Sequence, residues 1–242
     1  MLLPQARTIS SGDLVGLYDW PEPAWVRACM VMTLDGSVTG PDGLSGSISS
    51  PTDRAVFSAV RSLADAYLVG SQTVRVEGYR PVRARPAAQA ERRRRGQRAA
   101  PTLAIVTGTC RFDWASVRFP ESDEPPILLT VESCDPGARA DAAAHGCQVV
   151  VVGEDRVDVA RAIGALGGRG LTRVACEGGP DLLRQLVRGG LLDEVDLTLS
   201  PTLVAAPARG SLGPAVLTRM RLHQLVEDDG YLFGRYVRDR VE

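Results

Sequence analysis

The chain of 242 residues has few aromatic residues, almost no net charge and no long hydrophobic run. Aromatics make up 5% of the residues and the formal net charge is −1, so the chain offers neither a base-stacking surface nor a strong positive field for nucleic acid. No stretch approaches 18 apolar residues, and the N-terminus lacks a basic-then-apolar signal region. We therefore expect a cytoplasmic protein that binds neither nucleic acid nor membranes.

The cysteines and histidines are too few and too scattered for a metal site. The cysteines are Cys29, Cys110, Cys134, Cys147 and Cys176. They are odd in number and never spaced as C-x-x-C, which argues against zinc and against a disulfide framework. Most have apolar neighbours, as reduced core thiols do, and Cys176 has no basic partner nearby that would make it a nucleophile. His145 and His223 have no ligand spacing, so we expect no metal.

What the chain does contain is a glycine turn between a strand pattern and a helix pattern. The apolar run from Arg173 to Cys176 ends in Glu177-Gly178-Gly179-Pro180, and leucines follow at helical spacing. Glycines let backbone N–H groups approach a ligand, a helix N-terminus favours anionic groups, and proline suits a first helical position. The turn has neither the Walker ending nor the dinucleotide G-x-G-x-x-G pattern. It predicts a nucleotide-type site with the Glu177 carboxylate beside the ligand.

Short apolar runs alternate with helical patterns along most of the chain. Strands are predicted at 26–34, 66–69, 103–106, 127–130, 149–152, 173–176 and 195–199, with a hairpin at 222–237. Helices are predicted at 50–63, 73–76, 135–145, 157–166 and 180–188, and Ser50-Pro51-Thr52-Asp53 is a typical helix start. This alternation predicts an α/β fold with a largely parallel sheet, helices on both faces and an antiparallel C-terminal hairpin.

Three other stretches bear on the organisation of the chain. We expect residues 1–25 to form a lead-in packed on the body and residues 26–242 to form one domain. Residues 37–49, rich in glycine and serine, predict a loop with a strand fragment. Six of the nine residues at 91–99 are charged, five of them arginine. Such runs are usually solvated, so we favour a mobile loop at 80–100 over a phosphate clamp.

Three segments that follow predicted strands are candidates for one cleft. In open α/β sheets, ligands bind beyond the carboxyl ends of the strands. Asp35-Gly36, residues 70–77 and residues 177–181 all lie at such ends. Asp35-Gly36 also suits a simple tight turn, and Arg61 also suits an exposed surface arginine, so both alternatives stay open.

Taken together, these segments resemble the pyrimidine reductase family of riboflavin biosynthesis, which has a dihydrofolate-reductase-like three-layer fold. The resemblance runs from about Arg27 onward and is carried by Met32-Thr33-Leu34-Asp35-Gly36, Ser49-Ser50-Pro51, Arg61, residues 68–74, Glu177-Gly178-Gly179-Pro180, Leu191-Leu192-Asp193-Glu194 and Ser200-Pro201. No deaminase signature of the form H-x-E with P-C-x-x-C occurs. The chain is most similar to the stand-alone reductases of actinobacteria.

The resemblance implies an enzyme that uses NADPH to reduce the ribosyl C1 of a ribosylaminopyrimidine phosphate such as 5-amino-6-(5-phosphoribosylamino)uracil. It implies Glu177 and Asp35 as catalytic residues, and Ser45, Arg61, Arg83 and Glu177 as substrate-binding residues. The cofactor-binding residues it implies are Val31, Met32, Ser47, Gly70, Ser71, Thr73, Glu77, Thr107, Gly178, Gly179, Pro180, Asp181 and Leu182. It also implies a homodimer, for which the hairpin at 231–237 is a candidate edge.

Two positions depart from the family pattern. Cys29 stands where many members have lysine, and Ser47 stands where tryptophan is often found. Losing one charge-assisted contact removes about 1.5–3 kcal/mol, which is enough to change substrate preference but too little to abolish hydride transfer. The alternatives are therefore a dihydrofolate or pterin reductase of the same fold and a non-catalytic nucleotide-binding protein. The sequence contains no unambiguous 2′-phosphate clamp that would separate NADPH from NADH.

Overall fold

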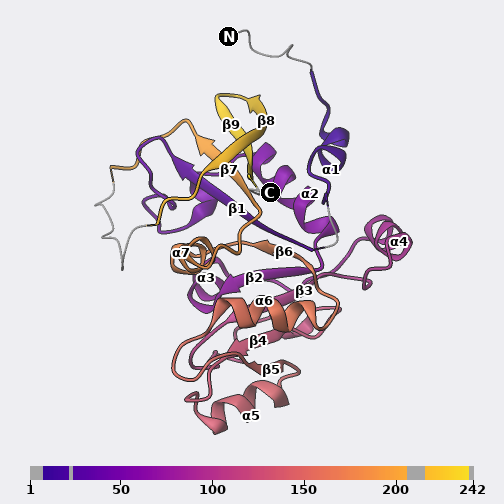
Figure 1. The fold of residues 1–242 in the computed structure, drawn as a ribbon, viewed down its shortest axis with the longest axis vertical. Helices are drawn as coiled ribbons and strands as arrows, with labels where there is room; N and C mark the ends of the chain where they lie inside the picture. The colour runs from indigo at the N-terminus through magenta and orange to yellow at the C-terminus, as the bar shows by residue number, and fades with distance from the viewer. Residues whose placement is uncertain (1–7, 22–23, 206–215, 240–242) are drawn as a thin grey trace.

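The computed structural model of the chain describes residues 8–21, 24–205 and 216–239 (Figure 1). Residues 1–7 and 22–23 of the expected lead-in, and residues 206–215 and 240–242 of the expected domain, lie outside the described residues. The strands are β1 (Trp25–Thr33), β2 (Ala66–Gly70), β3 (Thr102–Val106), β4 (Ile127–Thr130), β5 (Gln148–Val151), β6 (Arg173–Cys176), β7 (Glu194–Ser200), β8 (Met220–Asp228) and β9 (Tyr231–Arg238).

The described strands form one nine-stranded sheet in the order β5-β4-β3-β2-β6-β1-β7-β9-β8. The seven strands from β5 to β7 in this order are parallel, whereas β9 runs antiparallel to β7 and β8 antiparallel to β9. The central strands β2, β3 and β4 are almost wholly buried, as expected for strands covered on both faces. The predicted parallel sheet with a C-terminal hairpin is confirmed.

The helices are α1 (Leu14–Leu17), α2 (Pro51–Leu63), α3 (Ser71–Glu77), α4 (Pro86–Arg94), α5 (Pro136–Ala144), α6 (Val159–Gly167) and α7 (Pro180–Arg188), with short 3₁₀ turns at η1 (Ser11–Asp13), η2 (Ser45–Ser47) and η3 (Phe119–Glu121). Helix α2 begins as predicted, because the Ser50 hydroxyl accepts a hydrogen bond of 3.0 Å from the Asp53 N–H. Within the described ranges, no helix is both long and apolar enough to span a lipid bilayer.

The sheet carries a core on each face because neighbouring strand residues point in opposite directions. Tyr67 and Val69 of β2 belong to the core packed by α1, α2 and α5, whereas Ala66 and Leu68 belong to the core packed by α6 and α7. Helices α3 and α7 lie on the left of Figure 1, where the arrowheads of β1 and β2 point, and α4 lies on the right.

Two predicted loops differ from the structure. Residues 37–49 contain the 3₁₀ turn η2, and no strand fragment occurs there in the described chain. Residues 86–94 form helix α4, whose Arg92 is completely buried, so the expected solvated loop is wrong in its centre. Pro86 at the first helical position and the strong helix formers alanine, glutamine, glutamate and arginine favour this helix. The sequence prediction weighed the charge run and overlooked this propensity.

A buried charge cluster joins the lead-in to the sheet. Glu194 of β7, which is completely buried, accepts hydrogen bonds from Arg27 at 3.1 Å, Arg235 at 2.7 Å and the Trp25 indole at 2.8 Å. The Arg27 guanidinium also donates to the backbone carbonyls of Tyr18 and Asp19, at 2.8 and 2.9 Å.

The second carboxyl of this cluster, that of Asp196 on β7, titrates unlike Glu194. Its pKa is raised well above the usual range because burial disfavours its charged form. Glu194 carries a lowered pKa, because Arg27 and Arg235 outweigh the effect of burial. The cluster therefore packs two carboxyl groups between the same two arginines, and their pKa values are pushed in opposite directions.

Candidate active site

The candidate site lies where strands β2 and β6 end side by side. The strands are parallel, with Leu68 opposite Cys176. Beyond the last ladder pair, the Glu177 N–H donates to the Leu68 carbonyl at 2.9 Å, and the Gly70 N–H donates to the Gly178 carbonyl at 2.9 Å. These bonds bring together two of the three segments that were predicted to converge, residues 70–77 and 177–181.

Glycines make this junction close. A Cβ atom on Gly179 would lie 3.0 Å from the Thr73 hydroxyl oxygen, and one on Gly70 would lie 3.7 Å from the Gly179 nitrogen. Gly178 has a φ of +93°, a conformation that favours glycine. These glycines therefore let the two chain segments approach each other closely.

Two helix N-termini start from this junction. Gly70 is the N-cap of α3 and Gly179 the N-cap of α7, and neither helix has a side-chain hydrogen bond at its cap. The first N–H groups of a helix have no intrahelical acceptors, and the helix dipole adds partial positive charge there. The junction can therefore bind an anionic group such as a phosphate.

Beside the glycines, Glu177 and Arg61 form a two-point ion pair. Arg61 Nε donates to Glu177 Oε1 at 2.6 Å, and Arg61 Nη2 donates to Oε2 at 2.5 Å. The Tyr79 hydroxyl donates to the same Oε2 at 2.6 Å. The Glu177 side chain is only 1% exposed, whereas that of Arg61 is 31% exposed. The pair therefore lines the candidate site, with the Glu177 side chain buried and the Arg61 side chain partly exposed.

Three aromatic rings surround the Arg61 guanidinium. Its central carbon lies 4.2 Å from the ring centre of Phe57, 4.7 Å from that of Tyr67 and 5.6 Å from that of Tyr79. Burial opposes the arginine's charge, but the Glu177 carboxylate outweighs it and raises the pKa of Arg61. The pKa of Tyr79 is raised well above its usual value, first by burial and then by the Glu177 charge, so its hydroxyl keeps its proton and donates.

The contacts of Glu177 limit what the carboxylate can do for a ligand. A carboxylate offers about four acceptor positions, and Arg61 and Tyr79 occupy three of those of Glu177. The fourth position accepts no hydrogen bond from the described residues, and the side chain is only 1% exposed. Because the guanidinium lies directly on the carboxylate, the negative charge is largely neutralised at longer range.

Cys29 of β1 adjoins Glu177 on the same face of the sheet, and Asp196 of β7 lies next to Cys29. Ala28 pairs with Cys176, so Cys29 is the next neighbour of Glu177, and Cys29 in turn pairs with Asp196 of β7. Burial, followed by the Asp196 charge, raises the pKa of the Cys29 thiol well above its usual value. Burial raises the pKa of Cys176 to about 12. Raised pKa values oppose thiolate formation at both positions, which agrees with the expectation that Cys176 is not a nucleophile.

Asp35 lies apart from Glu177. Strand β1 continues to Thr33, four residues or about 13 Å beyond the level of Cys29, and Asp35 follows in the turn after it. Its carboxylate accepts hydrogen bonds from the Thr33 hydroxyl and from the N–H groups of Val204 and Ala205, the last two at 3.1 and 2.6 Å. The hydrogen bond from Thr33, followed by those from this backbone, lowers the pKa of Asp35. These contacts fix the chain that follows β7, and among the described residues no hydrogen bond or ion pair joins Asp35 to residues 70–77 or 177–181.

The remaining predicted residues fall into three groups. At the rim, the Ser45 N–H donates to Glu77 Oε1 at 3.0 Å, which joins the 45–47 turn to α3, whereas the Ser47 hydroxyl bonds Asp42 at 2.8 Å. At the ends of strands and helices lie Val31, Met32, Ser71, Thr107, Pro180, Asp181 and Leu182. Arg83 is 62% exposed and pairs with Asp123 at 3.8 Å, so no described contact joins it to Glu177.

Sequence reasoning missed the residues that hold the ion pair. Tyr79 follows Gly78, which ends α3 with a φ of +62°, and the Tyr79 N–H donates to the Val74 carbonyl at 3.3 Å. A glycine after a helix followed by a large apolar residue is a typical helix-ending motif, and it could have located Tyr79. Phe57 and Tyr67 gave no local signal beyond their place in a helix and a strand.

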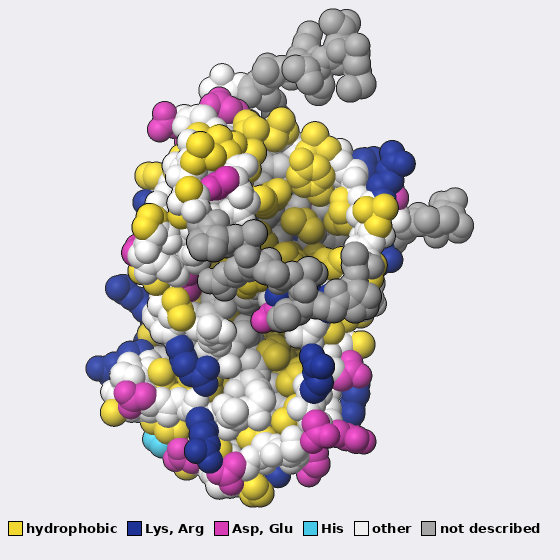
Figure 2. Space-filling model, turned by 90° about the vertical axis from the view of Figure 1, so that its left-hand side faces the viewer, with side chains coloured by type: hydrophobic (Ala, Val, Ile, Leu, Met, Phe, Trp, Pro, Cys, Tyr) yellow, Lys and Arg dark blue, Asp and Glu magenta, His cyan; other side chains and the backbone are white. Residues whose placement is uncertain are grey.

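Figure 2 faces the edge of the sheet to which β1 and β2 point, and shows hydrophobic side chains gathered in its upper half. Among the described residues, no group of three or more histidine, cysteine, aspartate or glutamate side chains could hold a metal ion. The site therefore consists of a glycine junction at two helix starts, a buried carboxylate–guanidinium pair and apolar surroundings.

This fold and site define an oxidoreductase of the pyrimidine reductase class with a dihydrofolate-reductase-like fold. The chain belongs to the RibD C-terminal domain family, whose sequence profile matches residues 24–230. The resemblance inferred from the sequence motifs is thereby confirmed.

Curated relatives and a solved structure agree with this assignment. The 2,5-diamino-6-ribosylamino-4(3H)-pyrimidinone 5′-phosphate reductase of Archaeoglobus fulgidus is 24% identical over 203 residues, covering 83% of this chain and 92% of that protein. The enzyme of the same name from Methanothermobacter thermautotrophicus is 31% identical over 175 residues, covering 72% of this chain and 76% of that protein. A pyrimidine reductase-like protein from Corynebacterium diphtheriae superposes with a TM-score of 0.80 at 28% identity, covering 90% of this chain and 93% of that one.

Proposed function

We propose that the protein is an NADPH-dependent reductase acting on the ribosyl C1 of a ribosylaminopyrimidine phosphate. One observation carries the proposal: the glycine junction at the starts of α3 and α7 lies directly beside the Glu177–Arg61 pair. The junction suits the pyrophosphate of a dinucleotide, and the pair suits a small polar substrate. A cofactor held by the first and a substrate held by the second would meet within the same site.

The carboxyl edge of the sheet offers room for the rest of the dinucleotide. Gly70 pairs with Val106, so Thr107 follows at the same level, two strand spacings or about 10 Å from the 177–178 turn. Next to Thr107 is a cavity of about 360 Å³ lined by residues that include Cys110, Arg111, Phe112 and Asp135. Its size and aromatic wall suit an adenosine group.

A preference for NADPH over NADH has a candidate origin in the same cavity. Arg111 lines it, and the Arg75 guanidinium lies 4.9 Å from the Phe112 ring centre and donates to the Arg111 carbonyl at 2.7 Å. Guanidinium groups suit phosphate oxygens, and the 2′-phosphate distinguishes the two cofactors. At the other end, Val31 and Met32 of β1 would border the nicotinamide, which supplies the hydride.

On the substrate side, Glu177 and Arg61 would act together. The remaining acceptor position of Glu177 would receive one N–H or O–H of the substrate, and the exposed part of the Arg61 guanidinium would bind its phosphate. Opening of the ribosyl ring breaks the C1–O4 bond and gives an imine, with the ring oxygen taking a proton. Hydride addition to C1 then yields a ribityl chain, and a proton from solvent balances the step. The two named relatives suggest the 2,5-diamino pyrimidinone as one substrate of this class.

A homodimer is the assembly that we propose for this enzyme. The predicted edge at residues 231–237 is wrong, because these residues belong to β9, which lies between β7 and β8. Strand β8 is instead an outer strand of the sheet, and its Leu222 and Leu225 are 47% and 54% exposed. An edge strand with exposed leucines is a natural site for association. Analytical ultracentrifugation should give a dimer for the native chain and a monomer for Leu225→Glu, and two equal monomer profiles would contradict this assembly.

A substrate panel tests the proposed reaction. The protein is titrated with NADPH and with NADH by nicotinamide fluorescence, and oxidation at 340 nm is then followed with three candidate substrates. These are the 2,5-diamino pyrimidinone ribosylamine phosphate, 5-amino-6-(5-phosphoribosylamino)uracil and dihydrofolate. We expect tight NADPH binding and turnover with at least one pyrimidine. Turnover with dihydrofolate alone, or NADPH binding without any turnover, would overturn the proposal.

A further inference from the structure

The C-terminal end of helix α2 is held by side chains from several other segments. The last carbonyls of a helix have no intrahelical donors and need partners from elsewhere. In α2, the Trp20 indole of the lead-in donates to the Val60 carbonyl at 3.4 Å, and the Tyr67 hydroxyl of β2 donates to the Arg61 carbonyl at 3.2 Å.

The arginine-rich segment supplies the partners of the next three carbonyls. Arg92 Nη1 donates to the Ser62 carbonyl at 3.2 Å and to the Ala64 carbonyl at 2.6 Å, and Gln97 Nε2 donates to the Leu63 carbonyl at 2.8 Å. Arg92 is completely buried, and the described chain places no carboxylate within 4.0 Å of its guanidinium. Its charge instead faces the negative end of the α2 dipole, where a cation is favoured.

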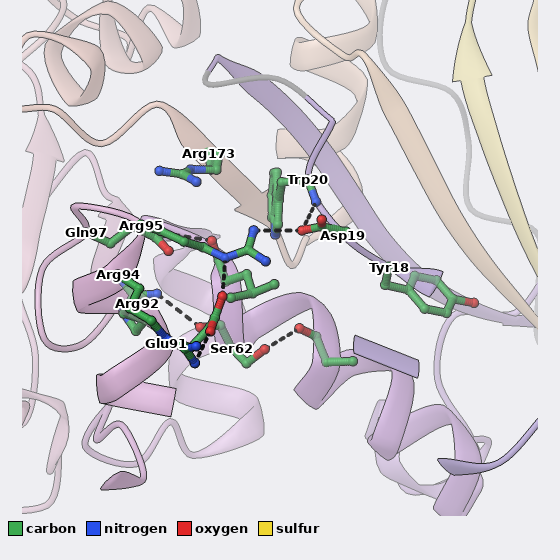
Figure 3. Close-up of polar contacts among 12 residues, drawn as sticks. Tyr18, Asp19, Trp20, Ser62, Glu91, Arg92, Arg94, Arg95, Gln97 and Arg173 are labelled. Atoms are coloured by element: carbon green, nitrogen blue, oxygen red, sulfur yellow. Dashed lines mark hydrogen bonds and ion pairs between the residues drawn. The ribbon is translucent and has the colours of Figure 1, made fainter. Parts of the chain in front are cut away.

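This segment is itself firmly tied to the body. Gln97 also donates to Asp65 Oδ1 at 2.6 Å, and Arg92 Nε donates to the Arg98 carbonyl at 2.9 Å. Figure 3 shows Arg95 reaching from α4 to Asp19 on the lead-in, at 2.9 Å, with Glu91 on its other side at 2.8 Å. Residues 86–97 therefore form a fixed cap on the end of α2.

The capped turn of α2 is the one that carries Arg61. Helical side chains tilt towards the helix N-terminus, so the Arg61 side chain runs back along α2, past Phe57, to Glu177. Both of its hydrogen bonds to the carboxylate are short, which leaves little tolerance for a shift of the helix along its axis. The carbonyls of residues 62–64 follow directly on Arg61, so their partners set where the guanidinium stands.

We propose that Arg92 and Gln97 are positioning residues for the Arg61–Glu177 pair. Both residues are remote from the glycine junction, because α4 lies near the start of strand β2, whereas α3 and α7 lie near its end (Figure 1). They touch neither the glycine junction nor Glu177, so cofactor binding should not depend on them. The activity part of this inference rests on the proposed function, whereas the geometry of the ion pair can be measured without it.

The test compares Arg92→Met and Gln97→Leu with Arg93→Ala, an exposed position on the same helix. The Nε–H resonance of Arg61 in 15N-labelled protein reports the hydrogen bond to Glu177, and Arg61→Lys assigns that resonance by removing it. Steady-state kinetics with the pyrimidine substrate, an NADPH titration and urea unfolding are measured on the same samples. Arg92→Lys, which keeps the charge and one donor, serves as the conservative variant.

We expect Arg92→Met to shift or broaden the Arg61 Nε–H resonance and to lower kcat/KM by about 10- to 100-fold, the range that a displacement near 1 Å produces. The Kd for NADPH should stay within twofold, Gln97→Leu should show a smaller change of the same kind, and Arg92→Lys should recover part of the loss. If Arg92→Met does not fold, Gln97→Leu carries the same test.

Two results would overturn the proposal. One is an unchanged Arg61 resonance in variants whose unfolding midpoint has fallen, because Arg92 and Gln97 would then serve stability alone. The other is an equal loss in Arg93→Ala. If the native protein turns over no substrate, the proposed function fails, but the resonance still decides the positioning role.

Discussion

Replacing Glu177 with glutamine is a sharp test of the site, because the change exchanges one oxygen for an NH₂ group. The carboxylate accepts two hydrogen bonds from Arg61 and one from Tyr79. Glutamine retains one acceptor oxygen and turns a donor towards the guanidinium. The substitution therefore removes the charge, breaks the two-point pairing and leaves the shape almost unchanged.

The expected cost in stability follows from burial. A hydrogen bond to a charged group contributes about 1.5–3 kcal/mol, and breaking a fully buried ion pair costs about 3–5 kcal/mol. The Arg61 side chain is 31% exposed, so water can replace part of the lost bonding. We expect Glu177→Gln to lower the free energy of unfolding by about 2–3 kcal/mol, from the lower part of these ranges.

The expected cost in activity follows from the one acceptor position that Glu177 can offer to a substrate. Losing one charge-assisted hydrogen bond, about 1.5–3 kcal/mol, corresponds to a fall in kcat/KM of roughly 10- to 150-fold. A larger, purely electrostatic loss is not expected, because Arg61 already neutralises the carboxylate. The Kd for NADPH should stay within about twofold, since in the proposed placement backbone N–H groups and not this side chain would hold the pyrophosphate.

Urea unfolding, NADPH fluorescence titration and NADPH oxidation at 340 nm measure the three quantities. Glu121→Gln is a matched control, because Glu121 is half exposed and pairs with Arg118 at 2.8 Å on the surface. It should change stability by less than about 1 kcal/mol and leave the kinetics unaltered. A kcat/KM for Glu177→Gln within threefold of the native value would remove Glu177 from the mechanism, and a loss of NADPH binding would show that the cofactor placement is wrong.

Three further substitutions test other parts of the molecule. Gly179→Val places a Cβ atom 3.0 Å from the Thr73 hydroxyl oxygen, so the Kd for NADPH should rise at least about tenfold, and an unaltered Kd would contradict the junction as the pyrophosphate site. Tyr79→Phe removes a 2.6 Å hydrogen bond to Glu177, so the free energy of unfolding in urea should fall by about 1 kcal/mol and kcat/KM should fall several-fold. Unchanged kinetics would refute this role of Tyr79. Burial raises the pKa of Asp196, so its stabilising contribution is complete below its ordinary pKa of 3.8 and is lost as pH rises towards the raised value. Asp196→Asn should therefore gain stability relative to the native protein as pH rises above 3.8, and a constant difference would contradict a raised pKa.

Much of the fold is readable from the sequence because the central strands are buried on both faces. β2, β3 and β4 appear in the sequence as short continuous apolar runs, and the Ser50 cap of α2 is a local signal. Helix α4 itself had a local signal, Pro86 followed by strong helix formers, that the charge run outweighed in the prediction. The burial of Arg92 had none, because it depends on the carbonyls of Ser62 and Ala64, about thirty positions away.

Only part of the candidate site was predicted, because the way strand ends meet depends on the relative lengths and register of strands that are far apart in the sequence. β2 and β6 are neighbouring parallel strands of five and four residues, and β2 ends only two residues beyond the level of the last residue of β6, so the rule that ligands bind at the carboxyl edge brings their turns together. β1 has nine residues and extends past both, which carries Asp35 away from Glu177. Strand ends share an edge only when the strands have similar lengths and register, and the sequence pattern fixed neither.

The arrangement of Arg61 and Glu177 bears on how the site could select its substrate. Their ion pair is complete without a ligand, and aromatic rings and Tyr79 hold it in place. Binding would not need to order two charged side chains, so the pair acts as a fixed template whose remaining acceptor and exposed guanidinium edge define what fits. Cys29, next to this template, contributes a thiol whose pKa burial raises, and so adds no positive charge there. A substrate held here would thus meet one arginine and one neutralised carboxylate, which favours a single phosphate and one hydrogen-bond donor over a polyanionic ligand.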